Sequence, residues 1–242
     1  MIELNVAGLK SRFVPARDGS ELRPNSIVVM LHGYGAPGDD LVFLADQLEV
    51  PSNTALVFPE APLDLDADTG LGNGARGWWP IDSIQLQVAM FTGQLALASR
   101  AAGAGRQDAR VMFSAFVDEL QARFGIGPSQ MVLGGFSQGA ILSLDWALHN
   151  DQPWAGLLCL SGTLVDGDDW KACLASRGAL RTLISHGQVD PILPFQLAQQ
   201  LSALLVQAGW EVEFKAFNGS HAIPPEVIAA VSQSIMRWLA KT

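Results

Sequence analysis

Short apolar runs and amphipathic patterns alternate along the chain from residue 26 to its end, and this alternation constrains the fold most. The apolar runs stop at turn-forming residues and predict strands over 26–31, 54–58, 131–136, 155–162, 180–187 and 210–217. Apolar stripes at helical spacing predict helices over 41–48, 109–124, 140–148, 194–208 and 225–239. We therefore expect an α/β fold, in which a mostly parallel central sheet carries helices on both faces.

The stretch 59–106 breaks this alternation, because it contains no clear strand and is rich in Gly and Ala. It is too long for a plain loop, so we expect an insertion after the second predicted strand, lid-like and with a helix within 81–100. No linker, repeat or low-complexity segment divides the chain. Its 242 residues suffice for one large core, and we expect a single domain over 1–242.

The net charge and the cysteine content of the chain limit which kinds of partner it can bind and which cellular compartment it suits. The net charge is −9, which argues against nucleic acid and anionic membrane surfaces, whose phosphates attract Lys and Arg. No apolar run reaches the roughly 20 residues that span a bilayer, so stable membrane insertion is not expected. Only Cys159 and Cys173 are present, and the first residues show no signal-peptide pattern, which together favour the reducing cytoplasm.

A Gly-x-Ser-x-Gly motif stands at one of the predicted strand-to-helix junctions, in the stretch MVLGGFSQGAILSL. A nucleophile in such a sharp turn has a strained backbone, and side chains two residues before and after it would collide with neighbouring backbone. Gly135 and Gly139 occupy those two positions around Ser137. The motif predicts a nucleophilic Ser137 at a helix N-terminus, where developing negative charge is favoured. The alternative is a serine that only caps the helix.

A nucleophilic serine needs a base and an orienting acid, which in this class of sheet follow it in the order acid, then histidine. His221 lies in the loop after the last predicted strand and is our candidate base; His186 ends a strand and is expected to be structural. Asp190, just past strand 180–187, is the candidate acid, although it could merely form the turn before a proline. Three rival acids follow strand 155–162 and resemble a solvated turn: Asp166, Asp168 and Asp169.

Hydrolysis also needs donors for an oxyanion. The amide of Gln138, directly after the nucleophile, is one candidate. The glycine-rich loop LHGYG over 31–35 offers the second, the amide of Tyr34. We expect His32 to anchor this loop.

Five motifs occur in order: LHGYG, GWWPID, GGFSQGA, HGQVDPILP and GSHAIPPE. Together, over about residues 26–240, they resemble the phospholipase/carboxylesterase family of α/β-hydrolases, which includes acyl-protein thioesterases and small bacterial carboxylesterases. The resemblance implies a serine hydrolase of the α/β-hydrolase fold, with a Ser137–Asp190–His221 triad, oxyanion donors at Tyr34 and Gln138, and an acyl groove bordered by the insertion. In this chain 64–106 is longer and richer in Ala and Gly than in compact thioesterases. Trp78 and Trp79 either line the groove or pack the insertion onto the sheet.

We expect hydrolysis of carboxylic esters through an acyl-enzyme on Ser137, with thioesters and lysophospholipids as further candidate substrates. The alternatives are an amidase or acyltransferase with the same triad, and a non-catalytic binding protein on a hydrolase scaffold. No cofactor is expected, and no metal, because the histidines are scattered. The expected partner is a small or lipid-like ester, and a homodimer is left open.

Overall fold

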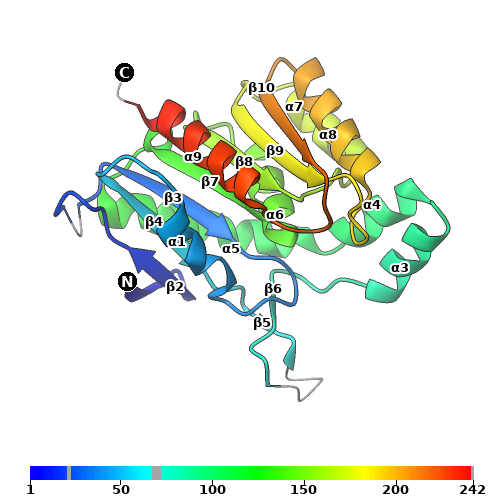
Figure 1. Ribbon diagram of the computed structural model, residues 1–242, viewed down its shortest axis with the longest axis horizontal. Helices are drawn as coiled ribbons and strands as arrows, with labels where there is room; N and C mark the ends of the chain where they lie inside the picture. The colour runs from blue at the N-terminus through cyan, green and yellow to red at the C-terminus, as the bar shows by residue number, and fades with distance from the viewer. Residues whose placement is uncertain (21–22, 67–71, 241–242) are drawn as a thin grey trace.

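An eight-stranded sheet forms the centre of the computed structural model, which describes residues 1–20, 23–66 and 72–240 (Figure 1). The strand order is β1-β2-β4-β3-β7-β8-β9-β10. All neighbours from β4 to β10 are parallel, whereas β1 pairs with β2 and β2 with β4 in antiparallel fashion. This confirms the mostly parallel sheet. The strands are Ile2–Val6 (β1), Leu9–Val14 (β2), Ser26–Leu31 (β3), Thr54–Pro59 (β4), Met131–Phe136 (β7), Gly156–Leu160 (β8), Arg181–Gly187 (β9) and Glu211–Phe217 (β10).

Helices cover both faces of the sheet, because successive residues of the central strands point to opposite sides. In β3, Ile27 and Val29 pack into the core beneath α5 (Arg106–Phe124), α6 (Gln138–Leu148), α7 (Gly167–Leu174) and α8 (Phe195–Gln207). Val28 and Met30 pack into the opposite core, with α1 (Leu44–Gln47) and α9 (Pro225–Leu239). Strands that are apolar on both faces are what this arrangement requires. In the part of the chain that the structure describes, no helix is both long and apolar enough to cross a bilayer.

The antiparallel hairpin β1–β2 lies upstream of the predicted elements and was missed. Ala7 and Gly8 form its turn, both with positive φ (47° and 83°), which suits a two-residue hairpin. Alternate residues of β2 are buried, and Phe13 stacks on Phe124 of α5 at 5.1 Å between ring centroids. The hairpin covers the edge of β4 that would otherwise be unpaired.

The helix boundaries also differ from expectation at three places. The segment 41–48 is a 3₁₀ turn, η1 (Asp40–Phe43), followed by the short α1. The expected helix within 81–100 is two helices, α3 (Ser83–Phe91) and α4 (Leu95–Gly103), because Gly93 has a φ of 67° between them. The third is α7, which lies where a solvated acidic turn was expected.

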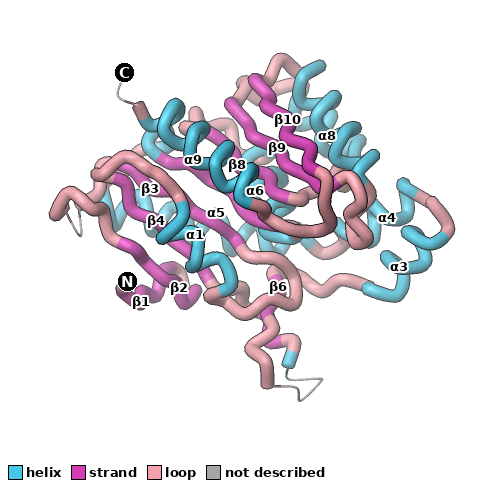
Figure 2. Tube along the Cα trace, in the orientation of Figure 1, coloured by secondary structure: helices cyan, strands magenta, loops and turns pink. Residues whose placement is uncertain are grey.

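The insertion after β4 has little regular structure before α3. Its described residues form a two-stranded ladder of β5 (Leu63–Asp64) and β6 (Arg76–Gly77), and the expectation for 67–71 lies outside the described residues. Figures 1 and 2 show α3 and α4 as a pair at one edge of the molecule, outside the layers that cover the sheet.

Candidate active site

Ser137 sits in the tight turn between β7 and α6. Its backbone is in a conformation rare for a residue with a side chain (φ 55°, ψ −117°), and its N–H donates to the carbonyl of Leu160 at 2.8 Å. A Cβ on Gly135 or on Gly139 would lie 2.4 Å or 2.1 Å from the carbonyl oxygen of Leu31. Both glycines are therefore required by close backbone contact, as the motif predicts.

Asp190 and His221 are directly hydrogen-bonded. The Nδ1 atom of His221 lies 2.7 Å from Oδ2 of Asp190, in the loop after β9. The other carboxylate oxygen, Oδ1, accepts hydrogen bonds from the amides of Ile192 (2.8 Å) and Leu193 (3.0 Å). The Asp190 side chain is buried, so these contacts fix its orientation and that of the imidazole.

His186 supports Asp190 from the other side. Its buried Nε2 lies 3.2 Å from Oδ2 of Asp190 and 3.0 Å from the carbonyl of Leu193. Both neighbours are acceptors, so Nε2 carries the proton. Burial by itself raises the pKa of Asp190, but the hydrogen bonds from His186 and His221 outweigh it and hold that pKa well below its usual range. His186 thus has a structural place, as expected.

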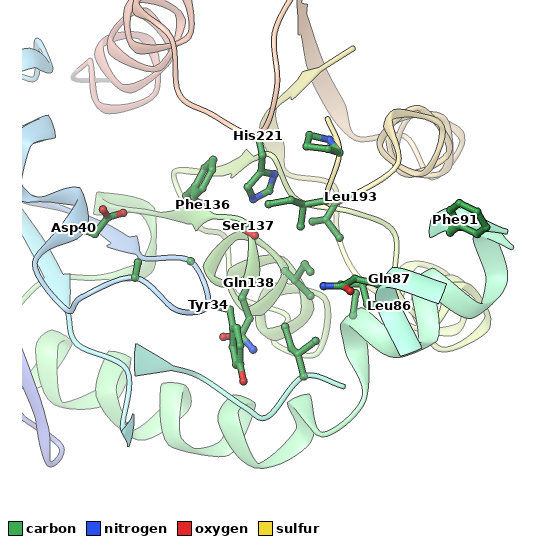
Figure 3. Close-up of a pocket in the computed structure, with 17 residues that line it drawn as sticks. Tyr34, Asp40, Leu86, Gln87, Phe91, Phe136, Ser137, Gln138, Leu193 and His221 are labelled. Atoms are coloured by element: carbon green, nitrogen blue, oxygen red, sulfur yellow. The ribbon is translucent and has the colours of Figure 1, made fainter. Parts of the chain in front are cut away.

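Ser137 and His221 line one cavity of about 620 Å³ (Figure 3). The His221 ring packs against Phe136 with 4.7 Å between centroids, and in Figure 3 the Ser137 hydroxyl points toward the imidazole. Most of the remaining lining is apolar and comes from the insertion, α6 and the loop after β9: Ile81, Leu86, Phe91, Ala102, Ile141, Pro191, Ile192 and Leu193. An apolar cavity beside a serine and a histidine suits an acyl chain.

Tyr34 and Gln138 line the same cavity. Gln138 is the first residue of α6, so its N–H has no intrahelical acceptor. The loop that carries Tyr34 is paired with the insertion, since the Gly35 amide donates to the Arg76 carbonyl at 2.8 Å and the Arg76 amide to the Ala36 carbonyl at 3.0 Å. These bonds fix the position of the Tyr34 backbone.

His32 anchors the same loop, in agreement with expectation. Its Nδ1 contacts the carbonyl of Gly33 at 2.8 Å, and its Nε2 accepts from the amide of Ala61 at 3.0 Å. Burial lowers the pKa of the His32 imidazole, which favours the neutral form that these contacts need.

Trp78 and Trp79 do not line the cavity; both are buried in the core between the insertion and the sheet. Trp78 and Trp79 therefore pack the insertion onto the sheet, and the expectation that they line the acyl groove was wrong. Both residues instead hold Gln138: its side-chain oxygen accepts from the Trp78 amide (2.9 Å), and its side-chain nitrogen donates to the Trp79 carbonyl (2.8 Å). The Trp78 indole also donates to the His32 carbonyl at 2.8 Å.

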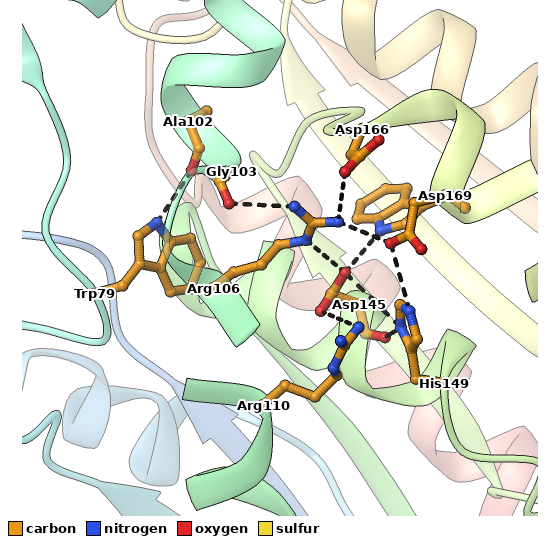
Figure 4. A network of polar contacts seen from close by, with 10 residues as sticks. Trp79, Ala102, Gly103, Arg106, Arg110, Asp145, His149, Asp166 and Asp169 are labelled. Atoms are coloured by element: carbon orange, nitrogen blue, oxygen red, sulfur yellow. Dashed lines mark hydrogen bonds and ion pairs between the residues drawn. The ribbon is translucent and has the colours of Figure 1, made fainter. Parts of the chain in front are cut away.

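Two of the rival acids, Asp166 and Asp169, lie elsewhere, around Arg106 (Figure 4). This buried guanidinium contacts Asp169 (2.8 Å), Asp166 (3.2 Å) and the fully buried Asp145 (2.7 Å). Arg110 and the Trp170 indole also bond to Asp145. Asp168 is fully exposed at the surface. The sequence analysis missed this network, which joins the end of the insertion to α5, α6 and α7.

One group of metal-ligand types lies together in the described part of the chain. Atoms of His149, Asp169 and Cys173 lie within 4.8 Å of one another, away from the cavity. The Arg106 guanidinium, 2.8 Å from Oδ2 of Asp169, opposes a cation at this place. We therefore assign it no metal. Both cysteines are free thiols.

The chain is similar to known proteins in both sequence and fold. Residues 18–239 match the phospholipase/carboxylesterase family. The chain is 26% identical to acyl-protein thioesterase 1 of Kluyveromyces lactis, over 98% of this chain and 97% of that protein. It is also 26% identical to a probable carboxylesterase of Oryza sativa subsp. japonica, over 96% of this chain and 85% of that protein. Among solved structures, the esterase PE8 superposes with a TM-score of 0.78 at 26% identity, covering 96% of this chain and 99% of that one.

The family match covers the whole sheet from β3 onward and every residue of the candidate site. The chain therefore belongs to the phospholipase/carboxylesterase family of α/β-hydrolases, and it is a serine hydrolase of ester or thioester bonds.

Proposed function

We propose that Ser137 is the nucleophile, His221 the general base and Asp190 the orienting acid of a carboxylic-ester hydrolase. The observation that carries this proposal is the shared cavity: the strained Ser137 turn and the His221 imidazole face it together, and Asp190 bonds to the far side of that imidazole. A nucleophile, a base and an orienting group in this order are the parts of acyl transfer.

In the proposed reaction, Nε2 of His221 takes the Ser137 hydroxyl proton while Oγ attacks the ester carbonyl. The resulting oxyanion accepts hydrogen bonds from the Tyr34 and Gln138 amides. His221 then gives its proton to the leaving alcohol, and an acyl-enzyme remains on Ser137. Water deprotonated by His221 attacks this ester, and the free acid leaves as the serine recovers its proton.

Asp190 has two roles in this scheme. It accepts a hydrogen bond from the Nδ1–H of His221 and so fixes the tautomer in which Nε2 is free to act as base. Burial opposes its ionised form, but the hydrogen bonds from His186, from His221 and from the Leu193 amide outweigh burial and keep the pKa of Asp190 low. A carboxylate that stays ionised stabilises the imidazolium formed during each proton transfer.

The apolar cavity supports substrates with a hydrocarbon acyl chain, including small esters, thioesters and lysophospholipids. The names of the relatives, acyl-protein thioesterase and carboxylesterase, lie within this range. In this proposal residues of the insertion, among them Leu86 and Phe91, act as a lid-like wall over the acyl chain.

The test is hydrolysis of p-nitrophenyl esters from short to long acyl chains. The parent protein is expected to cleave them, and Ser137→Ala to retain less than about one thousandth of the rate. Ser176→Ala, at an exposed serine, is the matched control and should be fully active. Equal activity of Ser137→Ala and the parent would refute the proposal. Labelling by a fluorophosphonate at Ser137 gives an independent readout.

A further inference from the structure

Helix α3 exposes an apolar face to solvent. Ile84 is 75% exposed, Val88 49% and Phe91 95%, and their spacing of four and three residues places them on one side of the helix. The opposite side is already packed, since Leu86 and Ala89 join a small core with Ala98 of α4 and Leu197 of α8. A surface helix ordinarily presents polar residues on its outer side.

The same face lacks charge. Between Asp82 and Arg100 the sequence contains no Asp, Glu, Lys or Arg, so neither α3 nor the first turn of α4 carries one. Elsewhere the chain is acidic, with a net charge of −9. An uncharged apolar patch on an acidic protein is suited to an uncharged apolar partner.

This patch is continuous with the cavity. Phe91 belongs to both, and in Figure 3 it marks the end of the cavity away from Asp40. Two more exposed apolar side chains, Val189 and Ile192, come from the loop after β9, and Ile192 also lines the cavity. A second hollow, lined by residues of α3 and α4 and by Asp190 and Phe195, shows that this loop faces the helix pair. We call these five exposed side chains, Ile84, Val88, Phe91, Val189 and Ile192, the mouth surface.

We propose that the mouth surface seats the protein on a zwitterionic lipid–water interface, from which acyl chains enter the cavity. Its apolar side chains are of the kind that insert at such an interface, and the negative net charge disfavours anionic lipids. A second copy on this surface would cover the cavity opening, whereas a lipid layer both covers it and supplies its ligand. Binding to the lipid interface does not depend on the proposed function. Only the statement that acyl chains of the lipid enter the cavity rests on it.

Binding is measured with Ser137→Ala, so its result does not depend on hydrolysis. The protein is floated with phosphatidylcholine vesicles and, separately, with vesicles rich in phosphatidylglycerol. We expect partition onto phosphatidylcholine, weaker partition onto the anionic vesicles, and a drop on the order of tenfold or more for the added pair Ile84→Gln and Val88→Gln. Neither of these two residues lines the cavity.

The matched control changes two equally exposed helical valines, Val111→Gln on α5 and Val206→Gln on α8, and should leave partition unchanged. With Ser137 intact, the double variant Ile84→Gln and Val88→Gln should hydrolyse monomeric short-chain esters at the parent rate. The parent is expected to act faster on esters above their critical micelle concentration than on monomeric ones, and this increase should be lost in the double variant. The proposal is overturned if phosphatidylcholine is not bound, if both pairs lose partition equally, or if sedimentation shows a dimer that only the Ile84/Val88 pair dissociates. Loss of all ester hydrolysis by the parent would instead refute the proposed function and leave the binding result standing.

Discussion

Replacing Gly139 by alanine tests the geometry of the site through a single methyl group. The new Cβ would lie 2.1 Å from the Leu31 carbonyl oxygen and 2.7 Å from that of His32. The shorter distance falls short of an ordinary 3.4 Å contact by about 1.3 Å, and both atoms are backbone. The loop that begins at His32 must therefore move relative to α6, which separates the Tyr34 and Gln138 amides. A misplacement of about 1 Å costs on the order of 100-fold in rate, and overpacking costs about 1–3 kcal/mol of stability.

The assay is kcat on a short-chain p-nitrophenyl ester, with urea unfolding of the same samples. We expect kcat for Gly139→Ala to fall about 100-fold or more while the protein remains folded at the assay temperature. Gly167→Ala is the matched control, because its Cβ meets nothing closer than 3.8 Å at the start of α7. A kcat within threefold of the parent, at unchanged KM, would refute the placement of the oxyanion donors at this junction.

Three further predictions follow from buried contacts. Asp190→Asn should lower kcat by about 10³–10⁴-fold, because the amide no longer holds the His221 tautomer. Because the pKa of Asp190 is lower in the folded than in the unfolded protein, its ionised carboxylate stabilises the fold fully above about pH 4, the pKa of an Asp in the unfolded chain. This stabilisation is lost as the pH falls from about 4 toward the lower pKa of the folded protein. Acid unfolding of Asp190→Asn, followed by circular dichroism, should therefore depend less on pH below about pH 4 than that of the parent. Arg106→Met should cost about 3–5 kcal/mol in urea unfolding, since Asp145 stays buried without its closest partner, and adding Asp145→Asn should recover part of the loss. Trp78→Phe should cost about 1 kcal/mol and slow ester hydrolysis several-fold, because the His32 carbonyl loses a donor.

The local pattern was enough to locate most of the sheet and the turn at Ser137. Strands such as β3 and β7 are apolar on both faces and lead into glycine-containing turns, and these are properties of a few adjacent residues. The candidate acid and base were also found from local position, because Asp190 and His221 follow the ends of neighbouring parallel strands. Parallel strands place their carboxyl ends at one edge, so topology brought the two side chains into contact.

The features that were missed depend on distant partners. Helix α7 buries only Trp170 and Leu174, too few positions for a readable period, and its acids look solvated until Arg106 is placed beside them. Arg106 itself is buried because Asp145, on another helix, neutralises it. The β1–β2 hairpin was readable in principle, since β2 alternates and Ala7–Gly8 is a turn, but its strands are short and rich in polar residues.

The contacts of Trp78, Trp79 and Arg106 have a consequence for engineering and for divergence within the family. Trp78 and Trp79 precede α3 and α4 in the chain and are hydrogen-bonded to Gln138. Arg106 follows these two helices and forms an ion pair with Asp145. Both fixed points lie on α6, the helix that follows directly after Ser137. The stretch between them, residues 80–105, forms a cassette whose replacement alters one wall of the cavity and leaves the nucleophile in place. Exchange of this cassette between relatives is therefore a more direct route to a new acyl preference than point substitution around the serine.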